Sequence, residues 1–199
     1  MSGLLDLVKG AIDSGVINKA ANQLGTTPNQ AESAIDAALP LLLGALGRNA
    51  AEPQGAQSLH RALERDHADN NPLSVLGNVL GGSGLGDGGA ILGHIFGGRQ
   101  ERASMGVSKA SGLDMGNSGQ LMAMLAPVVM SILGSQMKQR GLDSGGLGGL
   151  LGQERQRIEE DKGAGGLMNA VLDRDGDGDV DFADLAQNVG LLGSLFGRR

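Results

Sequence analysis

Two segments of the chain share one plan: LPLLLGALG at residues 39–47 and APVVMSILG at residues 126–134. In each, a proline is followed by six mostly apolar residues and then by a glycine. Helices this apolar belong in a protein core, and a proline within a helix removes a backbone hydrogen bond. We therefore predict two core helices, kinked or split at Pro40 and Pro127, that pack against each other as a pair.

Helix signals continue outward from these two segments. Thr27, Pro28 and Gln30 have the spacing of an N-cap, a first helical residue and the end of a capping box. Apolar spacing predicts further helices near residues 4–12, 14–24, 53–63, 72–80 and 90–96, then a polar link at 97–119 and a long apolar helix at 120–139. Strand-like alternation is rare, so the predicted fold class is all-α and multihelical.

The distribution of glycine suggests where the domains of the chain begin and end. It accounts for 36 of the 199 residues, and residues 141–152 are almost entirely Gly, Leu and Ser. Such a composition is typical of a flexible linker, and the charged residues 153–162 after it suggest a solvated helix. We therefore expect a helical domain at 1–140, a glycine-rich and charged linker at 141–163, and a C-terminal module at 164–199.

Composition excludes several classes of function. The net charge is −6, there are three Phe and no Trp or Tyr, and no basic stripe is visible, which argues against nucleic acid as a partner. The absence of Cys excludes disulfides, thiolate metal sites and a cysteine nucleophile.

The chain shows no pattern of membrane insertion or secretion. The longest nearly uncharged apolar run, Leu121 to Gly134, has 14 residues, which is short of the roughly 20 that span a bilayer. Asp6, Lys9 and Asp13 interrupt the N-terminal apolar residues, so this region resembles an amphipathic helix rather than a secretory signal. We expect a soluble, cytoplasmic protein without a transmembrane segment.

An acidic segment near the C-terminus has the spacing of a 12-residue EF-hand calcium loop. Ca²⁺ prefers six to eight oxygen ligands, which alternate residues of such a loop supply, and Gly178 stands at the sharp turn of position six. The predicted ligands are Asp173, Asp175, Asp177, Asp179 through its carbonyl, Asp181 directly or through water, and Asp184. This segment carries −5 of the net −6, because it holds six Asp and one Arg.

The residues around the acidic segment support a helix–loop–helix. Leu167 and Val171 give a short incoming apolar face, and an outgoing face follows at Leu185, Val189, Leu192 and Phe196. The last ligand is Asp184 instead of the usual longer Glu, so we expect weaker calcium binding, on the order of 10⁻⁵ to 10⁻³ M, with Mg²⁺ as a competitor.

Gly176, Gly178 and the Asp184-Leu185 pair make the loop resemble a dockerin repeat more than a calmodulin loop. Dockerins carry two such loops and this chain has one, so the resemblance does not imply a cohesin partner. A lone loop instead leaves open pairing across a homodimer.

The N-terminal region resembles the YidB-like bacterial family of unknown function over roughly residues 1–137. The resemblance rests on five landmarks in order, Leu4–Leu7, Thr27–Ala38, Leu39–Gly44, Asp87–Gly97 and Leu125–Met130. It implies a multihelical fold and a bacterial source, and it implies no activity.

Other candidate motifs are weaker. The glycines of GLGDGG at residues 84–89 match a dinucleotide-binding pattern, but no strand pattern precedes them. His60 and His67, near Glu64 and Asp66, are candidates for a metal or acid–base cluster, although surface or core-edge positions are the favoured interpretation. His94 is expected to be buried with a backbone partner.

The sequence thus predicts a calcium-binding, non-enzymatic protein that acts as a protein-interaction or structural module stabilised or switched by calcium. The alternative is a helical structural protein that self-associates into a homo-oligomer, in which the metal only stabilises the C-terminal tail. The protein partner is not identified by either interpretation.

Overall fold

The computed structural model describes residues 3–67, 74–75, 77–78 and 85–161. Within these ranges the chain is helical and contains no strand, which confirms the all-α class. The elements are α1 (Leu4–Ala11), α2 (Ser14–Leu24), α3 (Pro28–Ala51), α4 (Pro53–Ala62), the π-helical turn η1 (Leu63–His67), α6 (Leu85–Phe96), the 3₁₀ turn η2 (Gly97–Arg99), α7 (Gln100–Ser111), α8 (Met115–Arg140) and α9 (Ser144–Glu160).

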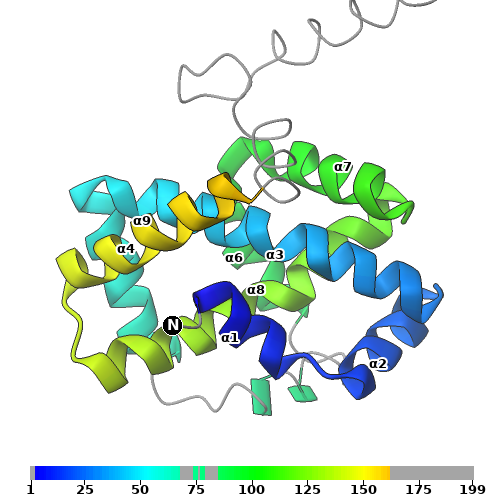
Figure 1. Ribbon diagram of the computed structural model, residues 1–199, viewed down its shortest axis with the longest axis horizontal. Coiled ribbons are helices and arrows are strands. Elements are labelled where there is room, and N and C mark those ends of the chain that lie inside the picture. Colours follow the sequence, from blue (N-terminus) through cyan, green and yellow to red (C-terminus); the bar gives the residue numbers. More distant parts are fainter. Residues whose placement is uncertain (1–2, 68–73, 76, 79–84, 162–199) are drawn as a thin grey trace, which may run out of the picture.

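The two proline-containing helices form the centre of the fold, as predicted. α3 and α8 pack against each other, and the remaining helices surround them (Figure 1). Pro40 and Pro127 lie inside these helices, and neither proline splits its helix, since α3 runs unbroken for 24 residues and α8 for 26. The two segments quoted at the start, 39–47 and 126–134, are buried throughout.

Local signals set several helix ends where the sequence predicts them. The Asp13 side chain accepts a hydrogen bond from the backbone N–H of Val16, and α2 ends at Gly25, which has φ 63°. Thr27 Oγ1 accepts from the N–H of Gln30 at 3.3 Å. The capping box is only half formed, because Gln30 Oε1 accepts from the hydroxyl groups of Thr26 and Thr27.

The predicted polar link at residues 97–119 is wrong. It contains helix α7, whose buried face is made of Ala103, Ser104, Gly106 and Val107, and α8 begins at Met115 rather than at residue 120. Small side chains let α7 lie close to α3 and α8 while adding little to the apolar pattern of the sequence.

The predicted flexible linker at residues 141–152 is also wrong, because helix α9 begins at Ser144 and runs to Glu160. The helix predicted for the charged residues after that linker is confirmed as the second half of α9. Leu147, Leu151 and Ile158 are buried in the same core as α3 and α8, and Glu154 is buried beside them. Spacings of four, three and four place these four residues on one helical face, which packs on α3 and α4. The helical domain therefore extends beyond residue 140 to the end of α9, and the charged half of α9 is not wholly solvated.

In the described ranges, one helix has the length and apolar composition of a membrane span. This is α8, and 83% of its most apolar window is buried inside the protein, as is common for the central helix of a soluble fold.

Candidate functional site

The predicted calcium loop lies outside the part of the chain that the structure describes. This holds for all six predicted ligands, Asp173, Asp175, Asp177, Asp179, Asp181 and Asp184, and for both apolar faces that flank them. Among residues 3–67, 74–75, 77–78 and 85–161, no three His, Asp or Glu side chains are grouped so that they could hold a metal ion. The candidate metal centre therefore stays a prediction from the sequence.

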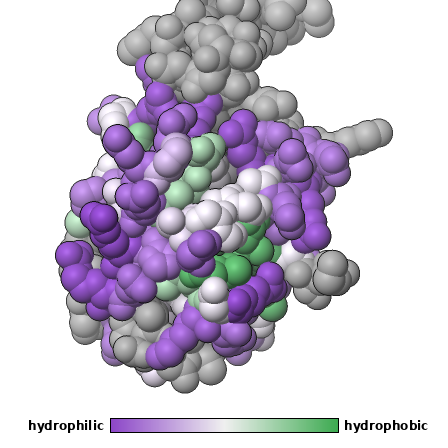
Figure 2. All heavy atoms as spheres, turned by 90° about the vertical axis from the view of Figure 1, so that its left-hand side faces the viewer, coloured by the Kyte–Doolittle hydropathy of each residue, from purple (hydrophilic) through white to green (hydrophobic). Residues whose placement is uncertain are grey.

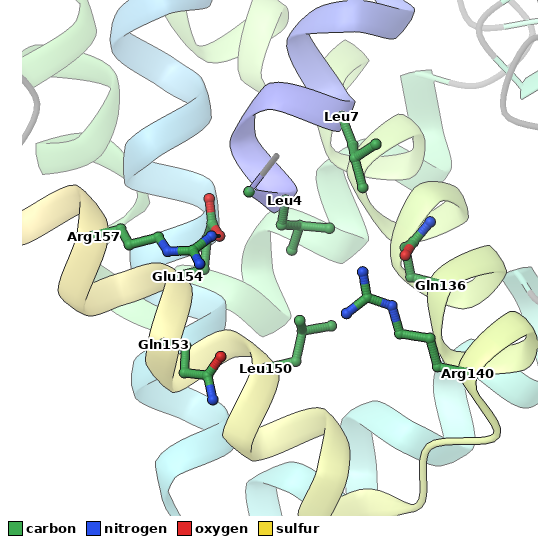
Figure 3. A pocket seen from close by; sticks show the side chains of 9 residues that line it. Leu4, Leu7, Gln136, Arg140, Leu150, Gln153, Glu154 and Arg157 are labelled. Atoms are coloured by element: carbon green, nitrogen blue, oxygen red, sulfur yellow. Dashed lines mark ion pairs between the residues drawn. The ribbon is translucent and has the colours of Figure 1, made fainter. Parts of the chain in front are cut away.

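A small pocket opens where α1, α8 and α9 meet. Its volume is about 100 Å³, and Leu4, Leu7 and Leu150 form its apolar part. Gln136 and Arg140 approach it from α8, whereas Gln153, Glu154 and Arg157 approach it from α9 (Figure 3). The face of the molecule on the left of Figure 1 shows an apolar area framed by hydrophilic side chains (Figure 2).

Glu154 is the most buried charged group beside this pocket, with 4% of the residue exposed. Its Oε1 accepts a hydrogen bond of 2.8 Å from the backbone N–H of Leu5, in the first turn of α1. Its Oε2 lies 3.7 Å from a guanidinium nitrogen of Arg157. A carboxylate at a helix N-terminus satisfies a free N–H and opposes the positive end of the helix dipole. Glu154 therefore holds α9 against α1.

Gly3 makes this contact feasible. A Cβ atom at this position would lie 2.8 and 2.9 Å from the two carboxylate oxygens of Glu154 and 3.1 Å from Arg157. Any larger residue would push Glu154 away from the start of α1. The site is a charged latch between two helices, with its carboxylate already engaged by protein groups.

Arg140 lies on the opposite side of the pocket from Glu154. Its side chain is directed across the opening toward the leucines of α1, while Glu154 and Arg157 come from α9 (Figure 3). The pocket therefore combines a small apolar floor with guanidinium groups on two sides. It has room for one small group.

The structure describes the side chains of two of the three histidines, His60 and His94. His60 Nε2 lies 3.1 Å from the carbonyl oxygen of Leu142, and Nδ1 lies 3.4 Å from a Glu64 carboxylate oxygen. With 20% of its side chain exposed, His60 occupies the core edge beside the α8–α9 connection, as predicted. The side chain of His67 lies outside the described structure.

The expectation that His94 is buried is wrong. His94 is exposed because Leu92, Ile95 and Phe96 occupy the buried face of α6. Its backbone carbonyl nevertheless has a partner, since Asn49 Nδ2 donates to the carbonyl oxygens of His94 at 3.3 Å and Ile95 at 2.9 Å. Asn49 thereby closes the C-terminal end of α6.

The glycine motif at residues 84–89 has a packing explanation. Residues 85–89 belong to the first turns of α6, and a Cβ atom at Gly88 would overlap the backbone carbonyl of Ala123 in α8. Glycine at this position permits two helices to approach closely. This arrangement differs from a strand–loop–helix that would hold a dinucleotide.

Sequence reasoning missed Glu154 and Asn49. Glu154 carried a usable signal, because it stands three residues after Leu151 and four before Ile158, on the apolar face of α9. A charged residue at a core position calls for a buried partner. Asn49 gave no comparable signal, since its partners are backbone groups 45 and 46 positions away.

Comparison with known proteins identifies the helical domain. No curated protein and no solved structure shows significant similarity to the chain. The family described as bacterial protein of unknown function, DUF937, matches residues 6–136, which is consistent with the YidB-like resemblance and stops short of α9. On that match, which spans α1 to most of α8, the chain belongs to the DUF937 family.

Proposed function

We propose that this DUF937 protein is a non-enzymatic calcium-binding protein, in which a helical interaction or structural domain is followed by a single EF-hand-like loop. The observation that carries the proposal is the spacing of six Asp and a glycine in residues 173–184. This order places carboxylates at positions 1, 3, 5, 9 and 12 of a calcium loop and glycine at position 6.

The chemistry of these donors favours a hard divalent cation. All of the predicted ligands are oxygens, and there is neither a thiolate nor a histidine in the segment. Oxygen-only sites select Ca²⁺, Mg²⁺ or Mn²⁺ rather than zinc or copper. A net charge of −5 within 12 residues is self-repulsive until a cation neutralises it.

The described domain supplies an anchor for such a loop. α9 is fixed to the core by three buried apolar side chains and by the Glu154 latch, and it ends at Glu160. Asp173 follows 13 positions later, so the first ligand stands at most about 45 Å from the end of α9. A cation bound there would lie within that distance of the end of α9.

Calorimetric titration of calcium into the metal-free full-length protein tests the proposal. We expect binding at one site per chain, weakened in the presence of Mg²⁺ and abolished by Asp173→Ala. Glu32→Ala, which removes an exposed carboxylate of α3, is the matched control and should bind like the wild type. No heat of binding at millimolar calcium, or equal binding by the Asp173 variant, would refute the calcium site.

Two further measurements separate a switch from a stabilised tail. If calcium changes what the helical domain contacts, amide exchange in residues 1–140 will differ between calcium and chelator. If the metal only stabilises the tail, that exchange and the sedimentation of the full chain will be the same in both conditions. The full chain is needed because ending it near residue 141 would remove α9 from the core.

A further inference from the structure

We propose that the surface of α3 and α4 beneath α9 is an exchange interface, on which the α9 helix of a second copy replaces the chain's own. The proposal rests on the fit of α9, on its weak helical preference and on its short connection to α8. It is independent of calcium binding.

The fit between α9 and this surface is close and specific. A Cβ atom at Gly148 would lie 3.0 Å from the carbonyl oxygen of Ala50, and one at Gly47 would lie 3.0 Å from the carbonyl oxygen of Leu151. Each helix thus has a glycine where the other presents its backbone. Leu147 and Leu151, on either side of this contact, are fully buried. An occupant must therefore be glycine-containing and apolar at the same spacing, and a second α9 meets this requirement by identity.

The α9 helix depends on this surface for its stability. Five of its 17 residues are glycine, and glycine disfavours helix more than any residue except proline. Gly148 is required by the close contact, but Gly149 and Gly152 would have nothing within 4 Å of an added Cβ. These two glycines weaken the helix without serving its packing. Detachment of α9 is therefore easier than opening of α3 or α8.

The connection between α8 and α9 is suited to exchange. It consists of residues 141–143, where Gly141 has φ 59° and the N–H of Leu142 bonds to the carbonyl of Met137. Asp143 caps α9 by accepting from the N–H of Gly146 at 2.7 Å. On detachment α9 loses its helical structure, and the helix and its Asp143 cap form again on the second copy. Exchange of one element across a short connection is a low-cost route to a dimer.

Exchange also conserves the charged latch. The bond from Leu5 N–H to Glu154 joins residues 149 positions apart, so it forms equally well between two chains. The contacts of Gly47 and Gly148 both join α9 to α3, so they too can form between two chains. The dimer thus keeps the contacts that α9 makes with α1, α3 and α4, and only the turn at residues 141–143 must change, so the protein concentration sets the ratio of dimer to monomer.

A cysteine pair reports directly which chain supplies α9. The protein has no cysteine, and a Cβ atom at Gly148 would lie 3.9 Å from Cβ of Ala56, within the range of a disulfide. After incubation of Gly148→Cys/Ala56→Cys under reducing conditions and then oxidation, we expect a covalent dimer on a non-reducing gel. Its fraction should rise with the protein concentration during incubation. Cross-linking within single chains only, at every concentration up to the millimolar range, would overturn the proposal.

A second experiment avoids any strain from the cysteine at Gly148. Light and ¹⁵N-labelled wild-type protein are mixed at high concentration, and hybrid dimers are followed by native mass spectrometry. Gly149→Ala/Gly152→Ala should slow hybrid formation about 10- to 30-fold, because alanine strengthens α9. The matched control is Gly89→Ala/Gly93→Ala in α6, where an added Cβ also has nothing within 4 Å, and it should leave the rate unchanged. No hybrid from wild-type protein, or equal slowing by both pairs, would overturn the exchange of α9.

Discussion

The backbone N–H of Leu5 and the carboxylate of Glu154 are joined by a hydrogen bond of 2.8 Å, although 149 positions separate the two residues. The bond connects the first turn of α1 to the middle of α9 and lies beside the pocket of Figure 3. It links the first turn of α1, where the family match begins, to α9, which lies beyond the matched residues 6–136.

Removing this carboxylate should destabilise the protein. Glu154→Ala leaves the partly buried N–H of Leu5 without its carboxylate partner, which costs about 1–3 kcal/mol of unfolding free energy. Glu154→Gln keeps an acceptor and should cost less. Urea unfolding followed by circular dichroism measures both changes. Glu159→Ala removes a half-exposed carboxylate of the same helix and should change stability by no more than about 0.5 kcal/mol. Equal stability of Glu154→Ala and the wild type would mean that the latch contributes nothing.

Leu151 tests whether α9 belongs to the core. Because its side chain is fully buried, Leu151→Ala should lower the free energy of unfolding by about 2–5 kcal/mol. Leu150→Ala, one position away and only partly buried, should cost distinctly less. Thermal and urea unfolding measure the difference. A flexible linker would tolerate both substitutions alike, so equal small effects would contradict the position of α9.

Gly88 tests the contact between α6 and α8. An alanine at this position would place its Cβ on the Ala123 carbonyl, and we expect a loss of about 1–3 kcal/mol as the helices move apart. Gly93→Ala in the same helix meets open space and should be neutral or stabilising by up to about 1 kcal/mol. Opposite signs for the two substitutions in one unfolding assay are the expected result. Similar values would show that α6 does not approach α8 this closely.

Asp184 tests the chemistry of the predicted loop. Glutamate is longer by one methylene and binds calcium through both oxygens at position 12, so Asp184→Glu should tighten calcium binding by about tenfold. Calorimetry in the presence and absence of Mg²⁺ gives the affinity and the selectivity. As a control, Glu160→Asp changes a carboxylate outside the loop by the same methylene and should have no effect. Unchanged affinity in Asp184→Glu would mean that position 184 is not a ligand.

The sequence predicts the parts of this fold that rest on large aliphatic side chains and on strong caps. Pro40 and Pro127 mark the central helices, and Thr27 and Pro28 mark the start of α3, because each acts on its own turn. α7 and the first half of α9 escape prediction. The buried face of α7 consists mostly of small residues, and the buried leucines of α9 are separated by glycines, which are typical of a linker. Such helices are stabilised by neighbours far away in the sequence, which a local pattern does not contain.

The two candidate sites also differ in whether neighbouring residues or distant ones determine them. The calcium ligands follow from spacing alone, since a metal loop is assembled from consecutive residues, and they stay a prediction because they lie outside the described ranges. The Glu154 latch depends on Leu5 and Gly3 at the other end of the domain. Only the unusual position of a charge on an apolar face pointed toward it.

The burial of α8 has a consequence for folding during synthesis. By length and composition alone α8 could cross a membrane, yet most of its apolar surface is buried in the protein. The helices that pack most extensively on it, α6, α7 and α3, all precede it in the chain. Because ribosomes deliver the N-terminal helices first, these partners have already been synthesised when α8 emerges. The main packing partners of α8 are therefore available to bury it as soon as it leaves the ribosome.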